Sequence, residues 1–288
     1  MDRRRLIQAG AGGLVAAQFP SLIAKGPDTK PVIKLGLVTY NWGKGWDLEQ
    51  LLKECESAGY DGVELRSTHA HKVEPSLTKA ERAEVKKRFA DSPVEPFGLG
   101  TACEYHSADP AILKKNIEET KAFIDLCHDI GASGIKVRPN GLPKDVPKEK
   151  TLEQIGKALD EVAAYGGDHG AQIRTEVHGR GTSEIANFIE IMKISQHQNS
   201  TVCWNCNKAD LEGAGLRENF LALRKRTSTI HIHDLRNKEG YPWVEFFDLL
   251  RESRFSGWTL VEEGKVPGDI PAAMREVRAL WEGMTKNW

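Results

Sequence analysis

The 288-residue chain has no excess of charge of either sign and few cysteines. Forty Lys and Arg residues face 41 Asp and Glu residues, which leaves a net charge of −1. No overall field therefore draws its surface to nucleic acid or to an anionic membrane. The five cysteines are an odd number, and their spacings contain no two-pair zinc knuckle, which excludes a framework that pairs every thiol. We expect no nucleic-acid partner.

A long hydrophobic run is missing from the N-terminus. The apolar stretch there, Ala9–Ala17, is rich in glycine and follows Arg3-Arg4-Arg5. It is far shorter than the ~20 residues of a membrane span. An arginine cluster ahead of a weakly apolar run resembles a twin-arginine export leader; a frayed basic start of a cytosolic protein is the alternative. We expect a twin-arginine-type signal segment and linker over residues 1–30, export to the periplasm, and no stable membrane insertion.

One cysteine pair has the spacing of a redox or metal motif. Cys203-Trp-Asn-Cys206 lies in an apolar run that reads as a strand, not at a helix N-terminus where a thiolate would be stabilised. Residues three apart on a strand face opposite sides, so we expect one thiol to point inward and the other outward. A structural role is favoured over a redox role.

Short β-type runs alternate with longer helical stretches from Ile33 onward, through eight rounds. The expected strands are 33–39, 62–65, 94–98, 135–137, 171–176, 200–204, 229–233 and 257–262. The expected helices are 47–57, 78–90, 109–130, 147–168, 183 onward, 216–224, 242–253 and 269–284. Start and stop signals such as Asp109-Pro110 and His169-Gly170 mark several of their ends.

Strict βα alternation with right-handed crossovers predicts a parallel sheet, and eight units close it into a (β/α)₈ TIM barrel. We expect a single α/β domain over residues 31–288. An open doubly wound sheet is the competing fold. It needs a glycine-rich phosphate turn after an early strand, and Tyr40-Asn-Trp-Gly-Lys-Gly45 is a poor match.

Metal-ligand residue types end four successive strands, where the functional groups of such barrels gather. The set that this suggests has three oxygen donors and one imidazole, which suits one divalent ion such as Mn²⁺ or Mg²⁺, with Co²⁺ or Zn²⁺ as alternatives. A lone Glu at a strand end is usually solvated and a lone inward His usually a bonded core residue. Carboxylates crowded at one barrel mouth, however, repel one another unless a cation neutralises them. The expected ligands are Glu176, Asn205, His233 and Glu262.

Three motifs together resemble the xylose isomerase-like barrels of the sugar isomerase/epimerase superfamily, from about Ile33 to the end. They are Ile173-Arg-Thr-Glu176-Val-His178, His231-Ile-His233 and Gly257-Trp-Thr-Leu-Val-Glu262. In the ketose 3-epimerases and inosose isomerases of that group, Glu, Asp, His and Glu hold the metal, and these positions fall on the four expected ligands.

The resemblance also implies a reaction. The metal binds two vicinal oxygens of a keto-sugar or related polyol, one glutamate removes the proton between them, and the other returns a proton to the enediolate. Glu176 and Glu262 would thus be both ligands and catalytic acid and base. We therefore expect a metal-dependent sugar isomerase or epimerase with a small carbohydrate as its substrate.

Two residues depart from that pattern. Asn205 stands where the family has Asp, so the site loses one negative charge, which should weaken divalent binding. Lys208 stands where the epimerases carry a His. A lysine there also disfavours the trinuclear zinc site of the related apurinic endonucleases.

Other polar and aromatic side chains at the strand ends are candidates for substrate binding. Each has a plain alternative: the charged ones could be salt-bridging loop residues, and the tryptophan could plug the barrel mouth instead of stacking on a sugar. The candidates are His178, Lys208, Arg236, His106 and Trp42.

Two other functions fit the same fold. A lyase or hydrolase of 3-keto-glycosides would use the same proton abstraction to expel a leaving group, and an exported location favours it. A sugar-binding barrel without turnover is the third reading, for which Asn205 is the only hint. The sequence leaves the sugar, the metal and a homo-oligomeric state open.

Overall fold

The structure, a computed structural model, describes residues 31–237 and 239–288. The leader and linker expected over residues 1–30 lie outside the described residues. Within them, no helix combines the length and the hydrophobicity that crossing a membrane requires.

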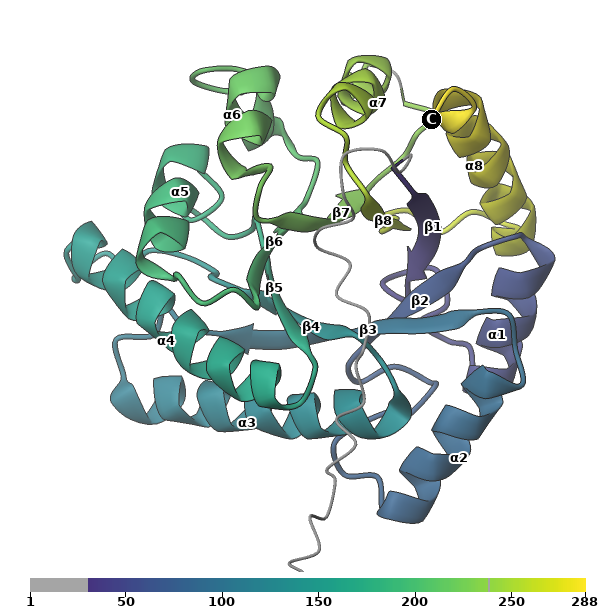
Figure 1. Cartoon of the computed structure of the whole chain (residues 1–288), viewed down its shortest axis with the longest axis horizontal. Coiled ribbons are helices and arrows are strands. Elements are labelled where there is room, and N and C mark those ends of the chain that lie inside the picture. The colour runs from purple at the N-terminus through teal and green to yellow at the C-terminus, as the bar shows by residue number, and fades with distance from the viewer. Residues whose placement is uncertain (1–30, 238) are drawn as a thin grey trace, which may run out of the picture.

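Eight parallel strands close into one barrel in sequence order, with β1 pairing with β8. This confirms the α/β (β/α)₈ fold, and the polypeptide winds once around the barrel axis (Figure 1). The strands are β1 (Ile33–Val38), β2 (Gly62–Arg66), β3 (Glu95–Glu104), β4 (Gly134–Arg138), β5 (Gln172–Glu176), β6 (Ser200–Trp204), β7 (Thr227–Ile232) and β8 (Gly257–Val261).

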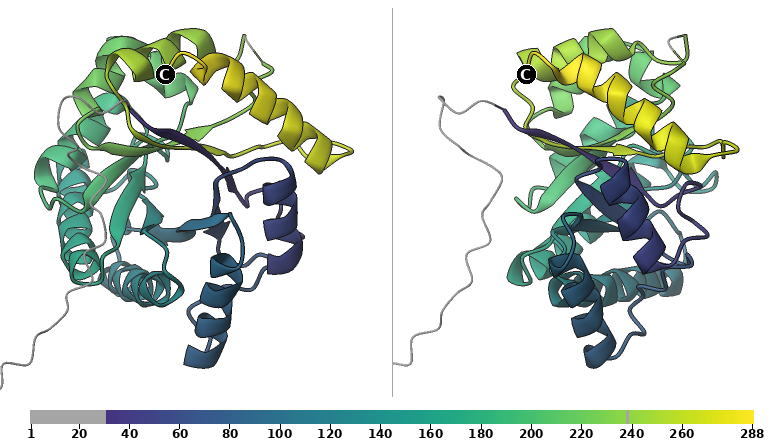
Figure 2. Two further views of the ribbon diagram at one scale, coloured as in Figure 1. Left: turned by 45° about the vertical axis from the view of Figure 1, so that its right-hand side comes forward. Right: turned by 90° about the vertical axis from the view of Figure 1, so that its right-hand side faces the viewer.

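An outer layer of helices covers the barrel, as the turned views in Figure 2 show. A short 3₁₀ helix, η1 (Lys208–Leu211), follows β6 and was not expected. The helices are α1 (Leu48–Ser57), α2 (Lys79–Ala90), α3 (Pro110–Ile130), α4 (Lys148–Asp168), α5 (Ile185–Ile194), α6 (Leu216–Leu223), α7 (Trp243–Glu252) and α8 (Ile270–Thr285).

Side-chain caps fix where several helices begin. Thr78 and Glu81 form a reciprocal capping box at α2, and Asp269 accepts a hydrogen bond from the Ala272 N–H at α8. Asp109 caps α3, which has a proline in its first turn and ends at Gly131 with a left-handed φ of 80°. The expected helix ends were therefore close, because they rested on local chemistry.

Most strand residues are buried, whichever face of the sheet they are on, because one face lines the barrel interior and the helices cover the other. The cysteine pair shows the same burial, with Cys206 beyond the end of β6. Cys203 and Cys206 are both free and buried. Burial raises the pKa of Cys203 to about 11 and raises that of Cys206 as well. These are inert thiols, and the redox reading of the pair has no support here.

Candidate functional site

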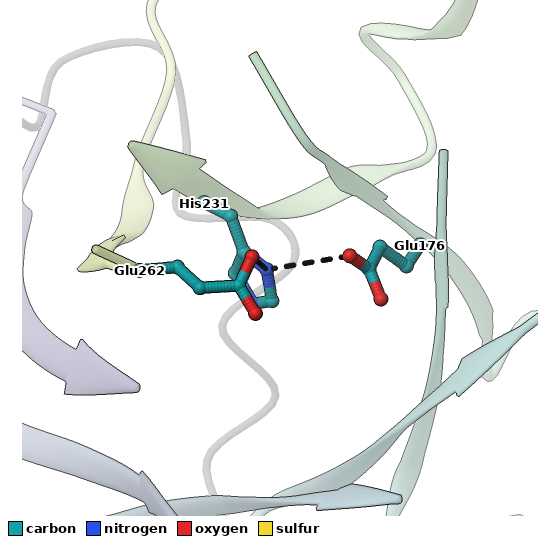
Figure 3. Close-up of side chains that lie close together, drawn as sticks. All are labelled: Glu176, His231 and Glu262. Atoms are coloured by element: carbon teal, nitrogen blue, oxygen red, sulfur yellow. Dashed lines mark ion pairs between the residues drawn. The ribbon is translucent and has the colours of Figure 1, made fainter. Parts of the chain in front are cut away.

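Three side chains from the last four strands meet inside the barrel. Glu176 ends β5, His231 lies in β7, and Glu262 directly follows β8; each offers one ligand atom, and these atoms lie within 4.8 Å of one another. His231 Nδ1 is 3.3 Å from Glu262 Oε2 and 3.9 Å from Glu176 Oε1. Figure 3 shows the side chains of Glu176 and Glu262 reaching toward the imidazole of His231 from their separate strands. We call these three residues the central cluster.

Two basic side chains contact the carboxylates of the central cluster. The ammonium of Lys136, on β4, is fully buried and lies 2.8 Å from Glu176 Oε2. Arg66 Nη1, from β2, is 3.8 Å from Glu262 Oε1. A buried carboxylate without such a partner would carry a cost of several kcal/mol. Lys136 therefore holds one oxygen of Glu176 and leaves the other facing His231.

The charges of the cluster shift the pKa of each member. Burial alone would raise the pKa of Glu176 and Glu262, but Lys136 and His231 lower both below their ordinary values. Against the opposing effect of burial, Cys203, Glu262 and Glu64 raise the pKa of His231 above its ordinary value. Both glutamates are thus ionised at neutral pH and can accept a proton.

Two of the four expected ligands belong to the central cluster, and the other two lie beside it. His233 directs Nδ1 to the Glu262 carbonyl oxygen at 2.8 Å and Nε2 to the Asn205 carbonyl oxygen at 2.7 Å. Both of its nitrogens are therefore engaged with the backbone. Asn205 is buried, and its Oδ1 has no hydrogen-bond partner among the described residues. The structure thus brings His231, in place of His233, to Glu176 and Glu262.

A hydrogen-bonded network joins the ends of β3, β4 and β5. Glu104 Oε1 accepts from Arg138 Nη2 and Asn140 Nδ2, each at 2.5 Å. The Asn140 amide oxygen is 2.6 Å from His178 Nδ1, and His106 Nδ1 lies 3.8 Å from Glu104 Oε2. We call these five residues the rim network. Two expected substrate-binding residues, His106 and His178, therefore sit in one network.

The remaining candidates lie around the ends of the other strands. Lys208 is exposed on η1. Arg236 Nε is 2.6 Å from Asp234 Oδ1, and its guanidinium lies 5.9 Å from the centre of the Trp42 ring. Trp42 is fully buried and donates its Nε1–H to the Lys265 carbonyl. That environment matches the alternative in which Trp42 plugs the barrel mouth.

Glu64, Lys136 and His231 are among the residues of the site that were not expected. Each is a charged or titratable residue inside an otherwise apolar run, as in Gly62-Val63-Glu64-Leu65 and Ile135-Lys136-Val137. A barrel strand is buried on both faces, so a charge in its middle needs a partner inside the barrel. The sequence carries this signal, but the expected ligands are residues at the strand ends.

The donor set of the central cluster fits a divalent metal ion. Two carboxylates and one imidazole are ligands that Mn²⁺, Co²⁺ and Zn²⁺ accept, and Mg²⁺ accepts the carboxylates. Both ring nitrogens of His231 are buried without a hydrogen-bond partner in the described part of the chain. Buried polar atoms are normally paired, so unpaired ones at a point of converging donors indicate a ligand.

Comparison with known proteins places this geometry in a wider group. The sequence model described as Xylose isomerase-like TIM barrel matches residues 52–282. The L-ribulose 3-epimerase of Methylomonas sp. (strain DH-1) is 24% identical over 233 residues, which cover 75% of this chain and 79% of that protein. This agrees with the resemblance seen in the three sequence motifs.

Solved structures show the same fold at low sequence identity. The IOLI protein with a bound zinc atom has a TM-score of 0.75 at 17% identity, over 88% of this chain and 99% of that one. The 3-keto-D-glucoside 4-epimerase of E. coli has a TM-score of 0.73 at 13% identity, over 86% of this chain and 99% of that one. At such identities the likeness shows the fold alone.

Proposed function

The chain belongs to the xylose isomerase-like TIM barrels, and we propose that it is a sugar epimerase or isomerase that binds one divalent metal ion and acts on a keto-sugar or related polyol. The observation that carries the proposal is the central cluster, in which Glu176, His231 and Glu262 converge within 4.8 Å. The curated relative, an L-ribulose 3-epimerase, supports the reaction class.

Glu176, His231 and Glu262 would hold the ion. A bound divalent ion would supply Lewis-acid polarisation of the substrate carbonyl and so make the neighbouring C–H more acidic. The identity of the ion, Mn²⁺, Mg²⁺, Co²⁺ or Zn²⁺, is part of what the experiment tests. Zinc in the similar IOLI structure supports a divalent ion in general.

The two glutamates divide the proton transfer. One carboxylate takes the proton from the carbon next to the carbonyl, and the electron pair of the broken C–H bond moves onto the carbonyl oxygen to give an enediolate. The other glutamate takes up a proton from solvent and delivers it to the enediolate, on the opposite face for epimerisation or at the neighbouring carbon for isomerisation, while the first glutamate releases its proton to solvent. Lys136 keeps Glu176 ionised for this exchange, since it lowers the pKa of that carboxyl.

The substrate contacts are proposed at the strand ends. His106 and His178 of the rim network, with Lys208 and Arg236 across the mouth, offer hydrogen-bond groups to sugar hydroxyls. Export through a twin-arginine leader is proposed for residues 1–30. Neither proposal is needed for the chemistry of the central cluster.

A 3-keto-glycoside lyase or hydrolase is the second candidate, and the E. coli 3-keto-D-glucoside 4-epimerase neighbour is compatible with it. Both candidates begin with the same proton abstraction. They differ in whether the enediolate is reprotonated or loses a leaving group.

Proton-exchange NMR in D₂O tests these alternatives. The protein is incubated with ketopentoses, ketohexoses and 3-keto-glucosides and with each of the four metal ions, and EDTA stops the reaction. Deuterium uptake with an intact carbon skeleton supports the proposal, and release of the aglycone indicates the lyase. If no substrate shows deuterium uptake or aglycone release, an enzymatic function is overturned and a sugar-binding barrel is favoured.

Variants connect the exchange to the cluster. Glu262→Gln should lower the exchange rate by about 10²- to 10⁴-fold, as expected for loss of a general acid or base. Glu95→Gln is the matched control, because Glu95 is exposed at the start of β3 and pairs with Lys34. Equal loss in both variants would contradict the assignment.

A further inference from the structure

Glu64 is a buried carboxylate for which the proposed reaction has no role. It lies in the middle of β2 and is 0% exposed, and neither of its oxygens has a hydrogen-bond partner among residues 31–237 and 239–288. The neighbouring strand makes room for it, because a Cβ on Gly100 of β3 would lie 2.8 Å from Glu64 Oε1. A buried, unpaired carboxylate is costly enough to need an explanation.

The nearest basic atom to Glu64 belongs to the central cluster. Glu64 Oε1 lies 3.5 Å from His231 Nε2, while Nδ1, the other ring nitrogen, faces Glu262 and Glu176. A neutral imidazole has one N–H and one lone pair, and an ionised carboxylate can only accept a hydrogen bond. Carboxylates face both nitrogens, and the closest is Glu262, 3.3 Å from Nδ1. A divalent ion held by Glu176 and Glu262 would take the lone pair of Nδ1, and the ring proton would then lie on Nε2, toward Glu64.

Cys203 also contacts the imidazole of His231. A neutral thiol is a weak acceptor. Glu64 is thus the carboxylate that faces Nε2, on the side of the ring away from Glu176 and Glu262.

Lys136 contacts Glu176 from inside the barrel, as Glu64 contacts His231. It occupies Oε2 at 2.8 Å and leaves Oε1 toward His231. Two strands that contribute nothing to the central cluster, β2 and β4, therefore each supply one residue that fixes one of its members from inside the barrel. Such supporting contacts typically set the tautomer and orientation of a metal-ligating histidine.

We infer that Glu64 is a positioning residue that holds the proton of His231 on Nε2 and so presents Nδ1 to a divalent metal ion. The inference rests on the proposed metal site. It adds a residue on β2 that contacts neither the ion nor the substrate but determines how tightly the ion is held.

Calorimetric titration of the full chain with Zn²⁺ tests this role. Glu64→Gln keeps the shape and an acceptor oxygen but removes the charge, and Glu64→Leu removes both. We expect Zn²⁺ affinity to fall by about 10- to 100-fold, the usual effect of losing an outer-shell partner of a metal-ligating histidine, with the larger fall in Glu64→Leu. Glu95→Gln, at the exposed end of β3, is the control and should bind as the wild type does.

A second measurement reads the tautomer directly. ¹⁵N NMR of histidine-labelled, Zn²⁺-loaded protein should show His231 with its proton on Nε2, and the His231→Gln spectrum identifies its signal. Glu64→Gln should move the Nε2 signal, because a neutral amide oxygen replaces the carboxylate that accepts from Nε2–H, and a purely structural role would not do this. Circular dichroism checks that each variant is folded; if Glu64→Leu is not, Glu64→Gln decides the result.

The outcomes separate the two proposals. Equal Zn²⁺ affinity and an unchanged ¹⁵N pattern in Glu64→Gln would overturn the role of Glu64 and leave the metal site intact. No Zn²⁺ binding by the wild type would overturn both. Zn²⁺ binding without turnover of any sugar would overturn the proposed reaction and leave the role of Glu64 standing.

Discussion

The barrel centre and the loop after β6 both bury polar groups, but the loop pairs one oxygen of Asp210 twice, and Asp210 Oδ1 and Asn205 Oδ1 are its unpaired atoms among the described residues. In the loop, Asp210 Oδ2 accepts from the Asn207 N–H at 2.9 Å and from the Tyr241 hydroxyl at 3.0 Å. The Tyr241 oxygen accepts in turn from Trp204 Nε1 at 3.2 Å. In the centre, the carboxylate of Glu64 and the imidazole of His231 have no hydrogen-bond partner within the described chain.

This difference separates polar groups that stabilise the fold from polar groups that bind a ligand. A paired buried network stabilises the loop that leads from β6 into η1, and a ligand would add little to it. Unpaired donors and acceptors that converge on one point have a cost that a bound ligand can remove. Buried polar residues therefore stabilise the fold in the loop and bind a ligand in the barrel centre. Substitutions in the two regions should have different effects.

The largest effect should come from the ion pair between Lys136 and Glu176 in the barrel centre. Lys136→Met leaves the Glu176 carboxylate buried without its cation, so the free energy of unfolding should fall by about 3–5 kcal/mol. Urea unfolding followed by circular dichroism measures this. The double variant with Glu176→Gln should recover much of the loss. Lys193→Met, which breaks an exposed pair with Glu190, should cost less than about 1 kcal/mol; an equal loss there would contradict the prediction.

The second largest effect should be on Zn²⁺ affinity, and it should differ between two histidines that lie two residues apart. His231→Gln should lower Zn²⁺ affinity by about 100-fold, or ~2.7 kcal/mol, because it removes a ring nitrogen that faces both glutamates. His233→Gln should lower it by less than about tenfold, since both nitrogens of His233 contact backbone carbonyls. Titration calorimetry on both variants decides. The reverse order would restore His233 as the ligand, as the sequence motif suggested.

These two histidines show how far the sequence could predict the site. The barrel and most helix ends followed from periodicity and from caps such as Asp109 and Thr78, which act locally. Which histidine of His231-Ile-His233 points inward depends on where β7 ends and on its register with β8, and neither is local. Because both histidines lie on the same face of an ideal strand, alternation alone cannot choose between them.

The smallest effect tests the loop region through its pH dependence. Burial raises the pKa of Asp210 to about 7, against the lowering effect of its bonds from Tyr241 and Asn207. The unfolded chain loses this proton near pH 4, whereas the folded protein keeps it until about pH 7. The folded state therefore binds more protons in that window, and stability decreases as pH rises through it. One proton corresponds to up to ~1.4 kcal/mol per pH unit, so the wild type should lose about 2 kcal/mol from pH 5 to pH 7 through this group.

Asp210→Asn removes this titration but keeps an oxygen for the same two hydrogen bonds. Its unfolding free energy should therefore change less than that of the wild type between pH 5 and pH 7, with the difference approaching 2 kcal/mol. Glu263, whose pKa burial raises to about 7, is present in both proteins, so its contribution cancels in the comparison. Urea titrations at pH 5, 6 and 7 give the two curves. Parallel curves would mean that Asp210 is ionised in the folded loop and that its paired network tolerates a charge, which would weaken the contrast with the barrel centre.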